Sequence, residues 1–184
     1  MVVGAIIINY ISACVQSLIG VEFTSAVNSI KLVGLRDTLI GIVSIAVVPA
    51  LIEEITIRGI IMQPLRKYGD MFAIITSALV FACMHGNLIQ IPYTVIGGLL
   101  MGYLVVATGS LWPSIILHFI NNLYSVIVMT TNDNFGDTVS MISVFVMIFI
   151  FVIVGIIGVI KYKKVKYSVE LYKNEELLTT REKV

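Results

Sequence analysis

The chain has 184 residues and a formal net charge of +1, with 58% hydrophobic and only 12% charged residues. Its mean hydropathy is +1.01, whereas a soluble domain carries about 25% charged residues. No Lys or Arg occurs between Lys67 and Lys161, which excludes a soluble domain. The basic run that begins at Lys161 directly follows an apolar segment, which is typical of a cytoplasmic stop rather than a phosphate-binding patch. The composition therefore predicts an integral membrane protein.

Continuous apolar runs divide the chain into six predicted membrane helices. A hydrocarbon core of about 30 Å needs about 20 helical residues to cross it. The runs show no strand-like alternation, so we expect an all-α, polytopic transmembrane helical bundle over residues 1–160, followed by a charged tail over residues 161–184. The expected spans are residues 2–21, 38–62, 71–85, 88–107, 111–129 and 139–160.

Charges in the connecting segments predict the orientation. Arg66 and Lys67 lie in the connection 64–70, and seven of the 12 basic residues lie from Lys161 onward. The connection 130–138 carries two Asp residues and no base. By the positive-inside rule, we expect the tail and the connection 64–70 to be cytoplasmic and the connection 130–138 to be external.

Ionisable residues cluster in the second predicted span, which contains Glu53, Glu54 and Arg58. A charged side chain at this depth costs about 2.5–3.5 kcal/mol on insertion scales, so function is the default interpretation. Glu54 and Arg58 are four residues apart and can neutralise each other on one helix face. Glu53 is turned by about 100° from Glu54, and we expect it to face a cavity, where a desolvated carboxylate suits general base catalysis. The alternative is that both glutamates only pair with Arg58 and hold helices together.

Both histidines of the chain lie in later spans. His85 ends the third span, and His118 and Asn122 are four residues apart on the fifth. An imidazole and a carboxamide on one face could bind a developing oxyanion. Taken alone, these residues could instead make interhelical hydrogen bonds, or His85 could meet the headgroups. In the fourth span, Gly98-Leu-Leu-Met-Gly102 has the small-xxx-small pattern that favours close helix packing.

Taken in order, these residues resemble the three signatures of the CPBP family of intramembrane proteases. The signatures are Glu53-Glu54-x-x-x-Arg58, Phe81-x-x-x-His85 and His118-x-x-x-Asn122. The family contains CAAX prenyl endopeptidases and bacterial proteins of bacteriocin processing or self-immunity. The resemblance covers residues 49–122 and implies a helical bundle with a polar cavity open to the cytoplasm. Relatives have more spans, so we expect a short member or one that lacks amino-terminal helices.

The resemblance also implies how the chemistry is divided among the three signatures. The first glutamate and the histidine of the second signature would activate a water molecule. The second glutamate and the arginine would hold their helix in place, and the third signature would stabilise the tetrahedral oxyanion. The candidate catalytic residues are Glu53, Glu54, Arg58, His85, His118 and Asn122.

The residues leave the use of a metal open. Zinc is the candidate cofactor, with Glu53, His85 and His118 as candidate ligands, because zinc binds imidazole nitrogens and carboxylate oxygens. No His-Glu-x-x-His or comparable compact motif is present. Asn122 is a poor zinc ligand at a position where an oxyanion donor is wanted, so we favour hydrolysis without a metal.

These observations predict an intramembrane endopeptidase that cleaves a membrane-associated, prenylated or leader peptide with glutamate-activated water. The expected location is a bacterial plasma membrane. The expected partners are the lipid bilayer and a peptide or protein substrate, with no nucleic acid; a homo-oligomer stays open. One alternative is a non-catalytic bacteriocin self-immunity or accessory membrane protein, which needs no such residue set. Another is an ion or proton pathway, although the internal repeats common in transporters are not visible.

Overall fold

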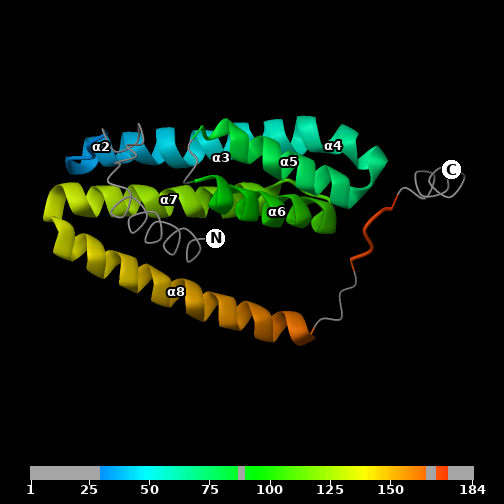
Figure 1. Cartoon of the computed structure of the whole chain (residues 1–184). Helices are drawn as coiled ribbons and strands as arrows, with labels where there is room; N and C mark the ends of the chain where they lie inside the picture. Colours follow the sequence, from blue (N-terminus) through cyan, green and yellow to red (C-terminus); the bar gives the residue numbers. More distant parts are fainter. Residues whose placement is uncertain (1–29, 87–89, 165–168, 174–184) are drawn as a thin grey trace, which may run out of the picture. The chain divides into compact units, whose positions relative to one another are not determined.

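The computed structural model describes residues 30–86, 90–164 and 169–173, and every regular element in these ranges is a helix. The first helical run contains α2 (Gly34–Gly41), the π-helical η2 (Ile42–Val47), α3 (Val48–Glu54), the π-helical η3 (Ile55–Ile61), α4 (Met62–Leu65) and the 3₁₀ segment η4 (Arg66–Tyr68). It is followed by α5 (Asp70–Met84), α6 (Ile91–Thr108), α7 (Trp112–Phe135) and α8 (Asp137–Lys164) (Figure 1). The predicted all-α class is confirmed.

Four helical segments of the described chain are long and apolar enough to cross a membrane, and each overlaps one predicted span. They are Gly34–Tyr68, Ile91–Thr108, Trp112–Phe135 and Asp137–Gly158. The third predicted span corresponds to α5, whose 15 residues reach only about 22 Å at 1.5 Å per residue. The first predicted span, residues 2–21, lies outside the described residues. Six spans are therefore not confirmed.

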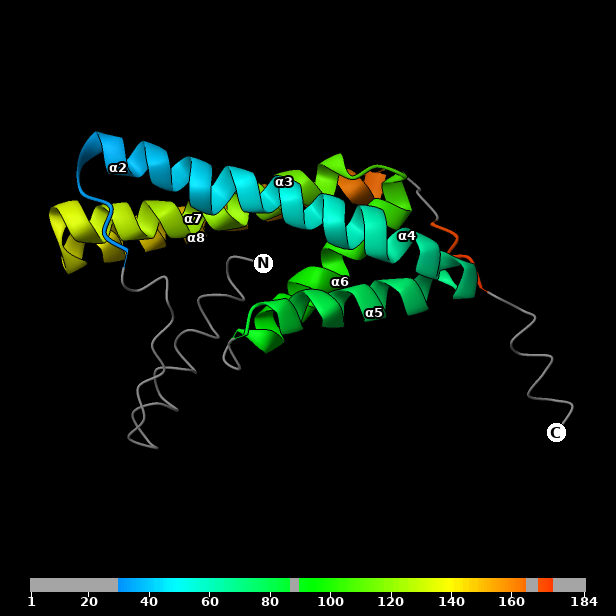
Figure 2. The same ribbon diagram turned by 90° about the horizontal axis from the view of Figure 1, so that it is seen from above.

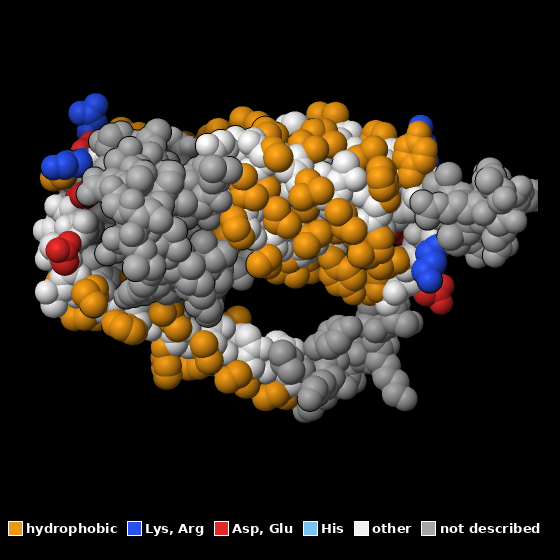
Figure 3. Space-filling view, viewed as in Figure 1, with side chains coloured by type: hydrophobic (Ala, Val, Ile, Leu, Met, Phe, Trp, Pro, Cys, Tyr) orange, Lys and Arg blue, Asp and Glu red, His pale blue; other side chains and the backbone are white. Residues whose placement is uncertain are grey.

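Apolar side chains cover the outer faces of these helices. Figure 3 shows them along the middle of the helices, with charged side chains gathered near helix ends. In α8, the apolar 18-residue window of the candidate span has none of its residues buried. Transfer of such an apolar surface from water to an apolar environment is favourable, and lipid tails provide that environment. The chain is an integral membrane protein.

Two prolines explain the irregular course of the first helical run. A proline has no N–H, so it removes one backbone donor from a helix. Pro49 comes directly after the start of α3, and Pro64 lies within α4. Near Pro64, the side chain of Gln63 donates to the carbonyl of Arg58, with an Nε2–O distance of 2.9 Å. The α-helical segment between the two π-helical segments ends with Glu53 and Glu54, and π-helical turns are frequent at functional sites.

The helices pack into two compact units, whose boundaries fall inside α3 and α7. The described part of the first unit comprises residues 30–50 and 118–164, and that of the second comprises residues 51–86, 90–117 and 169–173. The buried core of the first unit is formed by Leu32, Ala46 and Val126. The buried core of the second unit is formed by Met62, Ala73, Ile74 and Val105.

The connection predicted at 130–138 is mostly helical and therefore much shorter than predicted. Only Gly136, with φ of +79°, separates α7 from α8, and a residue without Cβ adopts this left-handed conformation at little cost. The polar residues before it have another role. Asp133 and Asn134 accept hydrogen bonds from backbone N–H groups just before and at the start of α2, at 2.7 and 2.8 Å. The Gly34 N–H, which Asn134 binds, is one of the donors that a helix amino terminus leaves without partners.

In the second unit, α5 and α6 lie side by side (Figures 1 and 2). A Cβ added at Gly98 would lie 3.0 Å from Ala78 Cα, and one added at Gly102 would lie 3.3 Å from the side chain of Ile74. Glycines therefore allow the two helices to approach closely, as the small-xxx-small pattern predicted.

A short extended segment of the tail contacts the start of α5. The N–H of Tyr172 donates to Asp70 Oδ2 at 2.8 Å, and the N–H of Asp70 donates to the Tyr172 carbonyl at 3.0 Å. Arg66 Nε lies 2.7 Å from the other oxygen of Asp70. The connection between α4 and α5 is shorter than predicted, because helical turns continue up to a single glycine. The contact joins this connection and the tail, consistent with the predicted topology, in which both lie on one side of the membrane.

Candidate active site

A fully buried ion pair lies in the second unit. Arg58 Nη1 is 2.8 Å from Glu54 Oε1, and both side chains have an exposed fraction of 0%. The pairing predicted from the four-residue spacing is confirmed. Breaking a buried pair by removing one partner costs about 3–5 kcal/mol, because the other charge stays buried without compensation.

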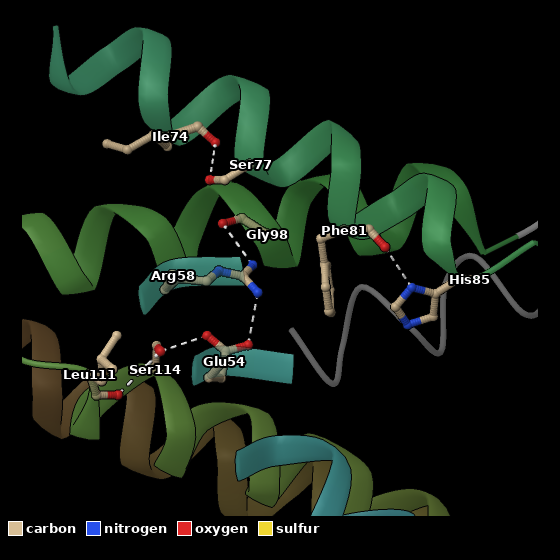
Figure 4. A network of polar contacts seen from close by, with 9 residues as sticks. All are labelled: Glu54, Arg58, Ile74, Ser77, Phe81, His85, Gly98, Leu111 and Ser114. Atoms are coloured by element: carbon tan, nitrogen blue, oxygen red, sulfur yellow. Dashed lines mark hydrogen bonds and ion pairs between the residues drawn. The ribbon is translucent and has the colours of Figure 1, made fainter. Parts of the chain in front are cut away.

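Two more helices contribute polar atoms to this pair (Figure 4). Arg58 Nη2 donates to the Gly98 carbonyl of α6 at 3.3 Å. Ser114 Oγ, in the first turn of α7, donates to Glu54 Oε2 at 2.6 Å. Both carboxylate oxygens of Glu54 therefore accept hydrogen bonds. The network joins α3, η3, α6 and the first turn of α7 in an apolar interior.

Phe81 connects this network to His85. The guanidinium Cζ of Arg58 lies 4.4 Å from the centroid of the Phe81 ring, which is a cation–π contact. The rings of Phe81 and His85 meet edge to face, with centroids 4.7 Å apart at 76°. The structure thus brings the first and second signatures into one cluster, drawn in Figure 4.

The end of α5 determines which nitrogen of His85 is reactive. The N–H groups of His85 and Gly86 bind carbonyls three residues back, each at 3.2 Å, so the last turn is tightened. His85 Nδ1 lies 2.8 Å from the carbonyl of Phe81, whose regular helical donor would have been the N–H of residue 85. A carbonyl only accepts, so Nδ1 carries a proton. In the neutral imidazole, Nε2 is then the nitrogen that accepts a proton or a hydrogen bond.

Glu53 differs from its neighbour in accessibility. It is half-buried, whereas Glu54 is fully buried. It is also turned by about 100° around α3 relative to Glu54. Glu53 nevertheless interacts electrostatically with Arg58, so the two glutamates are less independent than the sequence suggested. Of the two glutamates, only Glu53 keeps part of its surface exposed.

His118 and Asn122 belong to the first unit, one turn apart on α7. His118 is buried, with an exposed fraction of 4%. Asn122 is half-buried, and its Nδ2 donates to the carbonyl of Ile45 at 3.0 Å. In an α-helix that carbonyl would accept from the residue four positions later, but this residue is Pro49 and has no N–H. Asn122 thus makes an interhelical hydrogen bond, as the alternative interpretation of this residue predicted.

The described parts of the chain contain no cluster of side chains that could bind zinc. Within them, no three His, Cys, Asp or Glu side chains are grouped so that they could hold a metal ion. A zinc site takes about three or four such ligands.

Ser114 and the Gly98 carbonyl are the polar groups of the cluster that the sequence analysis missed. Ser114 precedes His118 by four residues on α7, so a search for polar residues on the helix face of His118 would have found it. Gly98 was noted only for packing. Its carbonyl has no sequence signal, because every residue has a backbone acceptor.

The fold and the cluster define a polytopic membrane protein with a buried Glu–Arg pair beside an imidazole and an accessible carboxylate. Residues 35–124 match the family model described as type II CAAX prenyl endopeptidase Rce1-like. This region belongs to the CPBP/CAAX protease family, as the three signatures predicted, and the family supports a CAAX-type intramembrane endopeptidase in general. The matched region contains all three signatures. The chain matches no curated protein and no solved structure.

Proposed function

We propose that the chain hydrolyses a peptide bond in a membrane-associated, prenylated or leader peptide, using water activated by Glu53. The family supports the endopeptidase class. The observation that carries the finer proposal is the cluster in the second unit, where Arg58 stacks on Phe81 and Phe81 contacts His85. Two of the three signatures thus form one local arrangement.

Glu53 rather than Glu54 is the base in this proposal. Glu54 is fully buried, and its two oxygens accept hydrogen bonds from Arg58 and Ser114. Glu53 is half-buried and next to it in α3. A base must come within hydrogen-bonding reach of the proton that it removes, and Glu53 meets this condition for water better than its neighbour does.

The proposed reaction uses two protein groups, Glu53 and His85, and one water molecule. Glu53 takes a proton from water, while His85 Nε2 accepts a hydrogen bond from the same water and orients it. The water oxygen forms a bond to the scissile carbonyl carbon, whose π electrons move to the carbonyl oxygen. As the C–N bond breaks, the oxyanion electrons re-form the carbonyl π bond and the C–N electron pair stays on nitrogen. Glu53 returns the proton to this leaving amine.

For the oxyanion we propose His118 and Asn122, on the basis of the third family signature. Donors aimed at the oxyanion strengthen as its charge develops. A carboxamide has two N–H groups, and the contact of Asn122 with Ile45 accounts for one of them. The second N–H is the proposed oxyanion donor.

The proposal is tested by incubating the purified protein with peptides in three forms: prenylated, unprenylated and with a leader segment. Mass spectrometry should show a defined cleavage that Glu53→Gln does not produce, and activity should survive removal of metal by a chelator. Activity that is lost with the metal and restored by zinc would contradict the metal-free chemistry. Failure to cleave any peptide would favour the self-immunity or accessory alternative.

A further inference from the structure

We propose that Ser114 is a positioning residue of the candidate active site. It holds the Glu54 carboxylate and thereby fixes the direction in which the neighbouring Glu53 carboxylate points. Ser114 is part of no family signature in this chain, yet it is fully buried against the ion pair. The role rests on the proposed function, because it presumes that Glu53 is the base.

The hydroxyl proton of Ser114 has one good acceptor. Its Oγ is 2.6 Å from Glu54 Oε2 and 3.2 Å from the carbonyl of Leu111. Hydroxyl-to-carboxylate hydrogen bonds are about 2.5–2.7 Å long, and charge assistance makes them roughly twice as strong as neutral ones. A hydroxyl has only one proton to donate. The geometry therefore assigns that proton to the carboxylate.

Two donors from different helices together hold the Glu54 carboxylate. Arg58 of η3 binds Oε1, and Ser114 of α7 binds Oε2. Without the Ser114 contact, one donor fewer holds the carboxylate, so it could turn about its own axis and α3 could rotate slightly. Glu53 is the next residue of α3, so any rotation changes where its carboxylate points. A displacement of about 1 Å at a reacting group can lower a rate by about 100-fold.

Ser77 is a matched control in the same unit (Figure 4). It is also fully buried, and its hydroxyl donates to the carbonyl three residues back, that of Ile74, at 3.1 Å. The corresponding distance for Ser114 is 3.2 Å, to Leu111. The difference that matters is the carboxylate beside Ser114. A change to alanine removes one buried hydroxyl at either position, but only Ser114→Ala releases an oxygen of Glu54.

The experiment compares Ser114→Ala, Ser114→Thr and Ser77→Ala, each purified in detergent and quantified as folded protein by thermal unfolding. With the peptide that the wild type cleaves, Ser114→Ala should lower kcat roughly 10- to 100-fold and change KM by less than about threefold. Ser77→Ala should stay within about twofold of wild type, because its hydrogen bond is local. Ser114→Thr keeps the hydroxyl and should recover most of the lost kcat.

The outcomes separate this role from the proposed function. If the wild type cleaves and Ser114→Ala is as active as Ser77→Ala, the positioning role is wrong and the proposed function stands. If the wild type cleaves no peptide, both are wrong. If Ser114→Ala does not fold, Ser114→Cys is measured instead. It keeps the shape of the side chain with a slightly larger atom and has only a weak donor, so an unchanged kcat in this variant overturns the role.

Discussion

The two adjacent glutamates of α3 have different surroundings, and this difference determines what each can do. Glu54 is enclosed by donors from Arg58 and Ser114, whereas Glu53 is half-buried. The spacing of Glu54 and Arg58 predicted their ion pair, since side chains four residues apart meet on a helix. Ser114 could not be predicted as a partner from that spacing, because it comes from a distant part of the chain.

Substitution of each glutamate should therefore affect a different property. Glu54→Gln removes the charge that compensates buried Arg58, so we expect the free energy of unfolding to fall by about 3–5 kcal/mol. Glu53→Gln should change it by less than about 1 kcal/mol, as for a more accessible site. Unfolding of the two variants in the same detergent measures this. Equal destabilisation would show that Glu53 also has a mainly structural role.

The helical elements could be predicted in type and approximate position, but not in their irregular parts. Pro49 indicates a missing backbone donor, yet the sequence does not say which group replaces it. The replacement is Asn122, on another helix. Similarly, Asp133 and Asn134 were predicted to lie in a connection between two helices, because Asp and Asn favour loops. They instead accept hydrogen bonds from the start of α2.

The contact between Asn122 and η2 gives a way to separate structure from catalysis. Asn122→Ala should lower kcat roughly 100- to 1,000-fold if the amide binds the oxyanion. It should also lower the free energy of unfolding by about 1–3 kcal/mol, since the Ile45 carbonyl loses a partner.

The variant Pro49→Ala supplies the control. Alanine has an N–H that can donate to the Ile45 carbonyl four residues back. In this background Asn122→Ala should cost less stability, while its effect on kcat should persist. If the loss of kcat disappears together with the loss of stability, Asn122 acts only through η2 and the oxyanion role is wrong.

At the scale of the whole molecule, the composition and three short signatures were enough to predict the membrane class and the family. The gap without Lys or Arg between Lys67 and Lys161 and the order of the signatures carried that prediction. The number of spans was not predictable to the same degree. α5 is mostly apolar but has only 15 residues, and hydropathy alone does not distinguish a short helix packed on α6 from a full span.

The orientation of the whole molecule in the membrane is also a prediction. The tail contacts Asp70 through Tyr172, so the tail and the connection before α5 should be accessible from the same side. In a background without native cysteines, Lys67→Cys and Lys166→Cys should react with a membrane-impermeant reagent only from the cytoplasm. Thr138→Cys, in the first turn of α8, should react only from outside. External labelling at residue 166 would contradict the topology.

The central claim is that Glu53 activates the water that cleaves the peptide bond. It is tested most directly by single-turnover cleavage in isotopically labelled water, with wild type and Glu53→Gln matched for folded protein. The wild type should place the heavy oxygen in the new carboxylate, and Glu53→Gln should be slower by roughly 100- to 10,000-fold, the range for loss of a general base. Equal rates in the two proteins, or cleavage without incorporation of label, would contradict the claim.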